Sequence, residues 1–178
     1  YLDLSRALKV CVSSWARIPD NCIPPRAKIS GSYVNAALQK TEAIMNGYDE
    51  AITLSYGTSF VCEGSAMNLF MVKNEILHTP PVSNDILEGI TRNAVIELAK
   101  EELDLPVVER QISRTELYSA DELFFCGTGA QIAPIGNVDG RIIGNNEIGE
   151  ITKKIQDIYF LAVKNKIKKY SMWCTKVI

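Results

Sequence analysis

The sequence has 178 residues, of which 47% are hydrophobic and 22% charged, and its formal net charge is -2 at pH 7. This length suits a single domain with one sizeable core, and the composition is that of an ordinary globular protein. The charge balance excludes the dense positive surface that nucleic acids or anionic membranes require, and no apolar run reaches the roughly 18 residues of a membrane helix. We therefore expect small molecules as partners, with no nucleic acid and no membrane.

The cysteines and the histidine restrict the possible chemistry further. The five cysteines are scattered and never spaced as CxxC, which predicts reduced thiols in the cytoplasm rather than a disulfide framework or a zinc module. The single histidine, His78, cannot build a His-rich metal site. A serine-histidine-acid triad would have to use His78, and a structural or surface role is the favoured alternative. We predict that no metal is bound.

The first half of the chain predicts one helix among short strands. Residues 9–14 alternate with β-branched positions and predict a strand, and the proline-bearing segment 19–25 is irregular. Residues 32–45 predict a helix that ends at Asn46-Gly47. One stripe of this helix carries Val34, Leu38, Thr41 and Met45. Turn residues separate four short strands, which favours hairpins over parallel crossovers: 51–55, 60–62, 69–73 and 76–79.

The second half predicts two long helices and more strands. The helix after LEGIT has a core-facing stripe of Ala94, Val95, Leu98 and Ala99. Its water-facing residues are Arg92, Glu97, Lys100 and Glu101. Strands are expected at 107–112 and 122–126, with a Ser113/Glu116 capping box between them and an Asp139-Gly140 hairpin after them. A last helix begins near Gly149. The pattern predicts an α+β architecture with short, mostly antiparallel strands.

Two glycine-containing stretches could each hold an anion. LEGIT places the amides of Ile90 and Thr91 and the Thr91 hydroxyl at a helix N-terminus, where anions bind favourably. CGTGA, residues 126–130, places Thr128 between two glycines after a strand. Taken singly, the first is more simply a helix cap and the second a tight turn. Together, without a GxxxxGK[ST] sequence, they favour a phosphate-bearing cofactor over nucleotide hydrolysis.

A lysine and a carboxylate stand in two further motifs. Lys28 lies in PPRAKISGSYVN, between a double proline and the start of a helix, and a lysine in such a place is ordinarily a surface charge. Glu63 lies in VCEGSAMNLF, where a turn carboxylate would be the simpler interpretation. Neither residue indicates a reaction when it is considered alone.

Considered together, these motifs resemble a known family. EGSAMNLF, LHT and LEGITR occur in the order and with the gaps of the class IV aminotransferases, the pyridoxal-phosphate enzymes of fold type IV. The branched-chain amino-acid aminotransferases are the most similar branch, and the likeness covers nearly all of the chain. The resemblance implies the large, cofactor-binding domain of that fold over residues 1–178, with strands in a barrel-like arrangement surrounded by helices.

The resemblance also implies a role for individual residues. Lys28 matches the lysine that binds pyridoxal 5'-phosphate covalently and then moves a proton during catalysis. Glu63 matches the carboxylate beside the pyridine nitrogen, which keeps the ring an electron sink. The other matched residues contact the cofactor or the substrate: Tyr33 at the phenolic oxygen, Leu87 against the ring, Ile90, Thr91 and Thr128 at the phosphate, and Thr128, Gly129 and Ala130 at the substrate carboxylate.

The sequence departs from the family pattern in three places. Residues 127–131 read GTGAQ where branched-chain enzymes commonly have GTAAE, and Met67 stands where a polar residue or glycine is frequent. The family also has a smaller N-terminal domain that supplies an arginine to the phosphate. Nothing in this sequence corresponds to that domain, and the sequence begins with Tyr rather than Met. We expect the chain to be a fragment that could be inactive alone.

The implied reaction is transfer of the amino group of Leu, Ile or Val to 2-oxoglutarate by a ping-pong mechanism, in a homodimer or a higher homo-oligomer. Three alternatives remain open. A D-amino-acid transaminase and an aminodeoxychorismate lyase share the lysine and the carboxylate. A noncatalytic pyridoxal-phosphate-binding module would also bind the cofactor.

Overall fold

The computed structural model describes residues 2–177, and the elements below belong to that range. The strands are β1 (Leu8–Val12), β2 (Glu50–Leu54), β3 (Val61–Gly64), β4 (Asn68–Lys73), β5 (Ile76–Thr79), β6 (Val107–Glu109), β7 (Glu122–Gly127), β8 (Gln131–Val138) and β9 (Arg141–Ile142). The α-helices are α1 (Tyr33–Met45), α2 (Ile90–Leu103), α3 (Arg114–Leu117) and α4 (Glu150–Val163). Short 3-10 helices occupy Pro25–Ala27, Ser30–Ser32 and Lys168–Trp173.

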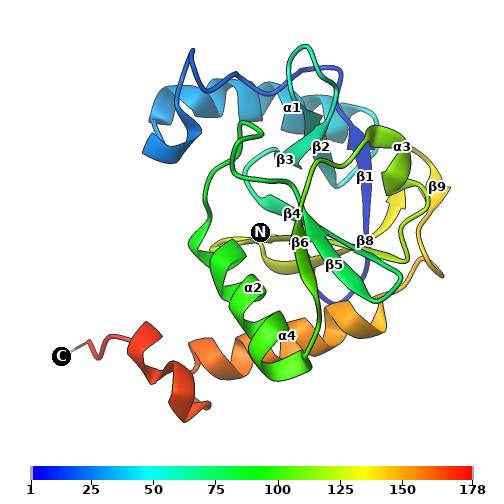
Figure 1. The fold of residues 1–178 in the computed structure, drawn as a ribbon. Coiled ribbons are helices and arrows are strands. Elements are labelled where there is room, and N and C mark those ends of the chain that lie inside the picture. Colours follow the sequence, from blue (N-terminus) through cyan, green and yellow to red (C-terminus); the bar gives the residue numbers. More distant parts are fainter. Residues whose placement is uncertain (1, 178) are drawn as a thin grey trace.

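All the strands within residues 2–177 belong to one curled sheet. Its order is β3-β2-β1-β8-β7-β4-β5-β6, and β9 pairs with β8. Helix α1 lies on one side of the molecule, while α2 and α4 lie together on another (Figure 1). The sequence-based prediction of an α+β fold with strands curled as in fold type IV is confirmed.

Most strand pairs are antiparallel, as predicted, but three are parallel. β2–β3 and β4–β5 are the expected hairpins, and β4–β7, β7–β8 and β8–β9 are antiparallel as well. The parallel pairs are β1–β2, β1–β8 and β5–β6. Parallel neighbours need a crossover, and α1 supplies it between β1 and β2 while α2 supplies it between β5 and β6. The short length of the strands therefore did not predict the direction of every strand pair.

Strands β4 and β7 connect two apolar clusters on opposite faces of the sheet. Leu69 and Met71 of β4 belong to one cluster, whereas Phe70 and Val72 belong to the other, under α2 and α4. Side chains alternate between faces along a strand, so these two buried strands contribute to both clusters. In the second cluster the Phe70 and Phe124 rings stack with centroids 5.1 Å apart.

Helix α1 presents its predicted stripe to the surface. Val34 and Met45 are 67% and 81% exposed, while the buried residues of α1 are Ala36, Gln39 and Ala43. The small alanine side chains let α1 approach β2 closely, so the larger apolar residues are left on the outer face. The stripe was correctly identified, but it does not pack on the core.

Helix α2 corrects one prediction. Arg92 was expected to face water, but it is only 2% exposed. Its guanidinium donates hydrogen bonds from Nη2 to Glu109 Oε2 at 2.6 Å and to the Pro80 carbonyl at 3.1 Å. A buried guanidinium is tolerated because these acceptors replace water. The helical period alone could not predict this, since the acceptors come from other elements.

Two local predictions are confirmed. Glu116 Oε1 accepts the backbone N–H of Ser113 at 2.8 Å, as the capping box requires. Asp139 and Gly140 both have positive φ and join β8 to β9.

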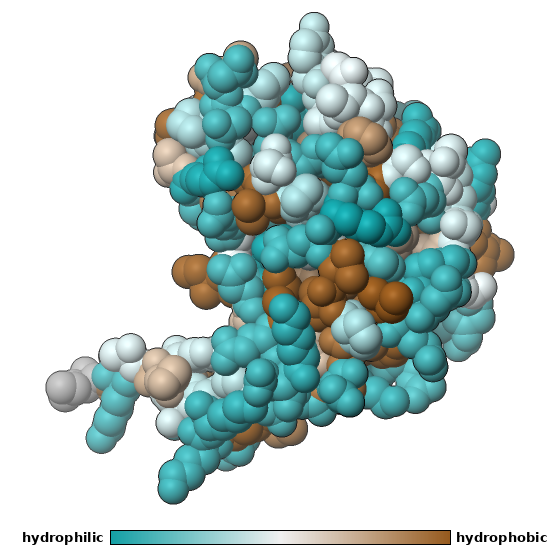
Figure 2. Space-filling view, in the orientation of Figure 1, coloured by the Kyte–Doolittle hydropathy of each residue, from teal (hydrophilic) through white to brown (hydrophobic). Residues whose placement is uncertain are grey.

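Among the described residues, no helix combines the length and the apolar character needed to span a membrane. Figure 2 shows a mixed surface, with apolar patches on the main body and a C-terminal segment that projects from it.

Candidate active site

A cavity of about 430 Å³ lies where several connecting segments meet. The segment around the 3-10 helix Pro25–Ala27 forms one wall, and the start of α2 forms another. The turn after β3 and the turn between β7 and β8 complete the lining. Segments distant in sequence thus contribute to one site, as is usual where loops meet at the end of a sheet.

Glu63, at the end of β3, is a buried acidic residue in this cavity. It is 2% exposed, and its carboxylate has three donors. Arg17 Nη2 lies 2.7 Å from Oε1. Asn68 Nδ2 and the Leu87 backbone N–H donate to Oε2 at 2.9 and 3.2 Å. This set of donors fixes the carboxylate in one orientation, because each oxygen has its own partner.

The donors to Glu63 are themselves held in place. Arg17 is 8% exposed, its backbone N–H donates to the Leu54 carbonyl at 2.8 Å, and its Nε donates to the Asp85 carbonyl at 3.1 Å. Asn68 Nδ2 also donates to the Leu87 carbonyl at 2.8 Å. A Cβ added at Gly89 would lie 2.1 Å from Asn68 Oδ1, so glycine at this position makes room for the amide.

Burial raises the pKa of Glu63 to about 7. The Arg17 guanidinium, the Leu87 amide and the positive charges of Lys28 and Arg92 all act in the opposite direction. A further positive charge beside this carboxyl would therefore lower its pKa and favour the ionised form. A group that combines burial with a charged partner in a cavity is a candidate for function.

The start of α2 and the β7–β8 turn offer donors for an anion in the same cavity. Helix α2 begins after Gly89, whose position carries no side-chain cap, so the first backbone N–H groups of the helix have no capping acceptor there. Ile90 and Thr91 line the cavity at this helix start, and Thr128 and Gly129 line it from the β7–β8 turn. Both predicted anion-binding stretches thus meet at one cavity.

Lys28 and Tyr33 lie at the exposed side of the cavity. Lys28 has left-handed backbone angles of φ 49° and ψ 44°, and its N–H donates to the Pro25 carbonyl at 3.1 Å. Such angles are uncommon for a residue with a side chain, and they are concentrated at functional positions. Tyr33 is the first residue of α1, and 43% of it is exposed.

The structure brings nearly all of the residues predicted from the sequence to one cavity. Its lining includes Lys28, Tyr33, Glu63, Leu87, Ile90, Thr91, Thr128 and Gly129. Ala130 differs, because its side chain packs in the first apolar cluster and does not line the cavity. Its backbone still belongs to the turn that connects β7 to β8.

Sequence reasoning missed Arg17 and gave Asn68 no role. Asn68 stands inside the EGSAMNLF motif, so the motif could have indicated it. Arg17 lies in SSWARIP, which has no spacing that singles it out, and only the fold brings it to Glu63. Residues 2–177 contain no cluster of three or more His, Cys, Asp or Glu side chains placed to hold a metal. His78 Nδ1 instead accepts a hydrogen bond from Arg110 Nε at 3.2 Å.

A family model described as "Amino-transferase class IV" matches residues 2–138 of this chain. The chain belongs to this family. The matched range contains the whole cavity, from Arg17 to Gly129.

Curated relatives in the family include branched-chain enzymes. The chain is 54% identical over 177 residues to a probable branched-chain-amino-acid aminotransferase of Aquifex aeolicus (strain VF5), a match that covers 99% of the chain and 57% of the relative. It is 44% identical over 157 residues to the branched-chain-amino-acid aminotransferase of Escherichia coli (strain K12), with 88% and 50% covered. The chain thus spans about half the length of the curated relatives it matches.

Solved structures of the family have the same fold. One is the branched-chain amino acid aminotransferase of Thermobaculum terrenum in PLP-form, with a TM-score of 0.92 and 43% identity over 95% of this chain and 55% of that one. Another is the branched-chain aminotransferase of the thermophilic archaeon Thermoproteus uzoniensis with norvaline. It has a TM-score of 0.91 and 43% identity, and the match covers 96% of this chain and 56% of that one.

Proposed function

We propose that this chain is the cofactor-binding large domain of a pyridoxal-phosphate-dependent aminotransferase that acts on branched-chain amino acids. The observation that carries this proposal is the donor-held Glu63 carboxylate, in a cavity that also contains a lysine and two anion-binding segments. The family membership and the printed names of the relatives support the reaction class and the substrate.

The residues of the cavity fit pyridoxal phosphate. The cofactor has a phosphate, a ring nitrogen that becomes cationic on protonation and an aldehyde that reacts with amines. The uncapped start of α2 and the turn at Thr128 suit the phosphate. Glu63 suits the ring nitrogen, and Leu87 supplies apolar surface for the ring. Lys28 is the lysine among the lining residues and suits the aldehyde.

When bound, pyridoxal phosphate supplies an electron-withdrawing ring that stabilises negative charge at the α-carbon of an amino acid. Glu63 would maintain that property by holding a proton at the ring nitrogen. A buried carboxylate with a cationic partner is more favourable than a buried carboxylate without one. Arg17 and Asn68 orient Glu63, and Arg17 keeps its pKa from rising further.

Lys28 has two tasks in this proposal. Its amine would hold the cofactor, and once an incoming amine has displaced it, the same amine would take the proton from the substrate α-carbon and deliver it to the cofactor carbon that carried the aldehyde. Both tasks require an amine at the same position beside the cavity. Tyr33 lies on the same side of the cavity and orients the cofactor's phenolic oxygen through its hydroxyl.

The finer features of the proposal extend the family resemblance. The amino group of Leu, Ile or Val passes to 2-oxoglutarate in a ping-pong reaction, within branched-chain amino-acid biosynthesis or degradation. The substrate carboxylate lies at the turn of Thr128, Gly129 and Ala130. The full protein carries a second, smaller domain, forms a homodimer or higher oligomer and works in the cytoplasm.

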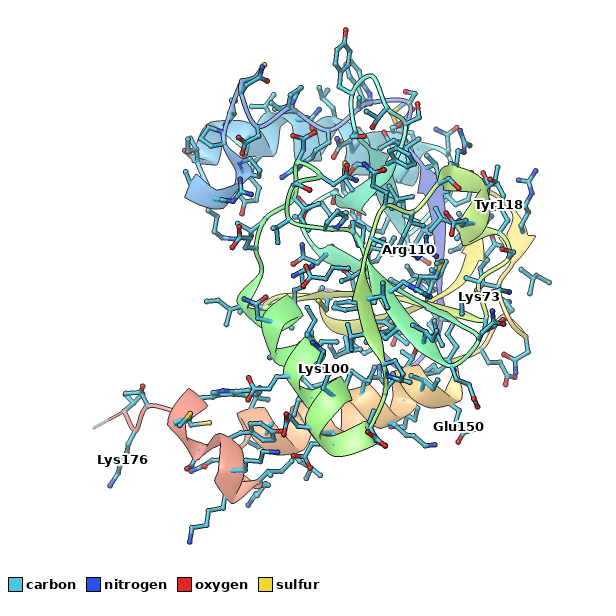
Figure 3. All side chains as sticks on the ribbon, viewed as in Figure 1. Lys73, Lys100, Arg110, Tyr118, Glu150 and Lys176 are labelled. Atoms are coloured by element: carbon cyan, nitrogen blue, oxygen red, sulfur yellow. The ribbon has the colours of Figure 1, made fainter. Side chains whose placement is uncertain are left out.

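Reduction with borohydride tests the cofactor assignment. Pyridoxal phosphate added to the protein should give a new absorption band. Reduction with borohydride should then attach the cofactor permanently to a peptide that contains Lys28. Lys28→Ala should abolish the labelling. Lys100→Ala is the matched control, because Lys100 is exposed on α2 away from the helix start (Figure 3). Retained labelling in Lys28→Ala would exclude Lys28 as the attachment residue.

Substrate comparison tests the reaction. The full-length protein should convert Leu and 2-oxoglutarate to 4-methyl-2-oxopentanoate and glutamate at a kcat/KM well above that for D-Ala. It should release no pyruvate from aminodeoxychorismate. Turnover of only D-Ala or only aminodeoxychorismate would overturn the branched-chain assignment, and cofactor binding without any turnover would favour the noncatalytic module.

A further inference from the structure

Met67 is a buried residue that both lines the cavity and belongs to the core. It is 3% exposed, it forms part of the cavity lining, and it packs in the first apolar cluster with Phe125 and Ala130. No role in the proposed reaction follows from its chemistry, because a thioether neither transfers protons nor binds anions. Its function must therefore come from its shape and position.

Two glycines make room for the Met67 side chain. A Cβ added at Gly64 would lie 2.8 Å from Met67 Cγ and 2.9 Å from Phe125 Cε1, so the volume beside Gly64 is already filled. A Cβ at Gly127 would lie 3.6 Å from Met67 Cβ. The Gly64 N–H also donates to the Met67 carbonyl at 2.7 Å. Met67 is thus fixed at its backbone and wedged between two glycines.

Strand register places Met67 beside the β7–β8 turn. Asn68 of β4 pairs with Cys126 of β7, so Met67 stands one step further along, level with Gly127. Gly127 pairs with Gln131, and residues 128–130 form the turn between them. Because Gly127 has no side chain, Met67 covers the backbone from which this turn departs.

The turn has little other support. In the described part of the chain, the ladder pair Gly127–Gln131 closes it, and neither backbone bonds outside the strands nor side-chain hydrogen bonds hold residues 128–130. The Ala130 side chain anchors its far end in the same apolar cluster as Met67. The packing of Met67 beside Gly127 and of the Ala130 side chain in the same cluster therefore supports the two ends of the turn.

We propose that Met67 is a positioning residue for the carboxylate group of the substrate. It acts through Gly127 by supporting the turn whose residues Thr128 and Gly129 line the cavity, and this role rests on the proposed function. The ligand class is a short-chain aliphatic carboxylic acid with its carboxylate at residues 128–130. Truncating Met67 would leave a gap beneath the turn, and a displacement of about 1 Å is sufficient to weaken an oriented contact strongly.

Ligand titration separates positioning from general stability. The probe is 4-methylvaleric acid, added to the full-length protein loaded with pyridoxal phosphate, and its binding is followed by the change in cofactor absorbance. Met67→Ala should raise the Kd of the probe about tenfold, with the Kd of pyridoxal phosphate changed less than about twofold. Met67→Leu, which keeps the volume, should bind the probe within about twofold of the unaltered protein.

A double variant tests the size match. Gly64→Ala alone should weaken probe binding, because the new methyl group displaces Met67. Gly64→Ala combined with Met67→Ala should lose less probe affinity than the sum of the two single losses, because the truncation frees space that the new methyl group occupies. If Met67→Ala is too unstable to purify, Met67→Val provides a milder truncation with the same expected direction.

The possible results distinguish two failures. Equal probe affinity in Met67→Ala and the unaltered protein would overturn the role of Met67 while leaving the proposed function intact. Parallel weakening of pyridoxal phosphate and the probe would also overturn it, because that result indicates general loosening. An unaltered protein that takes up no pyridoxal phosphate would overturn the proposed function itself, together with the inference that rests on it.

Discussion

The two sides of the cavity differ in how completely the chain organises them. At the inner side, the Glu63 carboxylate has three donors and almost no exposure. At the outer side, Ile90 is 86% exposed and Tyr33 is 43% exposed. The part that would control the charge of a ring nitrogen is preorganised, while the part that would meet the phosphate and the phenolic oxygen of the cofactor is open. Substitutions at the inner side should therefore affect folding, and those at the outer side should affect binding alone.

Breaking the inner ion pair should have the largest effect. Arg17→Met leaves a buried carboxylate without its cationic partner, and such changes cost about 3–5 kcal/mol in the free energy of unfolding. Urea unfolding measures this loss in the free energy of unfolding. The control is Arg6→Met, because Arg6 pairs with Asp49 at the same 2.7 Å distance but is 51% exposed. The control should lose less than about 1 kcal/mol. Similar losses in both variants would contradict the difference between buried and exposed pairs.

Titration of Glu63 should give the next largest effect. Its folded pKa of about 7 lies above the usual 4.5, so the folded state binds more protons between these values. Stability therefore falls as pH rises through this window, by on the order of 3 kcal/mol for this group, and is level above it. The measurement is the free energy of unfolding of the cofactor-free protein, followed by urea titration from below the usual pKa to above the folded one.

Glu63→Gln provides the reference for that titration. The difference between the two pH profiles isolates the Glu63 contribution, because the other acidic groups titrate in both proteins. Parallel profiles would show that Glu63 has the same pKa folded and unfolded, and would contradict the burial effect.

Crowding the Asn68 amide should have an intermediate effect. In Gly89→Ala the new methyl group would lie 2.1 Å from Asn68 Oδ1, so the amide must shift away from Glu63. We expect a loss of about 1–3 kcal/mol by urea unfolding. Gly31→Ala is the control, because nothing lies within 4 Å of its added Cβ, and it should be neutral or slightly stabilising. An unaffected Gly89→Ala would mean that the close approach is not required.

A change at the outer side should have the smallest effect. Ile90→Ser replaces an exposed side chain, and stability should stay within about 0.5 kcal/mol of the unaltered protein. Ile86→Ser, at a position with 1% exposure, should lose at least about 2 kcal/mol in the same assay. A loss above about 1 kcal/mol in Ile90→Ser would show that the outer side also contributes to the fold.

The difference between local patterns and long-range contacts explains which features the sequence could predict. Local patterns were sufficient for the Ser113/Glu116 cap, the Asp139-Gly140 hairpin and the helix that starts at Tyr33. The motif spacing predicted Lys28, Glu63 and Thr128 as site residues, because each stands in a recognisable segment, and all three line the cavity.

Long-range contacts were not predictable in this way. The burial of Arg92 depends on acceptors from two other segments, and the approach of Arg17 to Glu63 depends on how β1 and β3 flank β2. The outward stripe of α1 is similar, because helical period identifies a stripe but not the surface that will cover it.

Strand β4 couples the accuracy of folding to the presence of the site. Its residues alternate between the two apolar clusters, and its first residue, Asn68, holds Glu63. A slip of one residue against β7 would exchange Leu69 and Met71 with Phe70 and Val72, and would turn Asn68 away from the carboxylate. A chain that pairs these strands wrongly thus loses its core and its cavity in a single error, and no stable but inactive form with a shifted β4 is expected to accumulate.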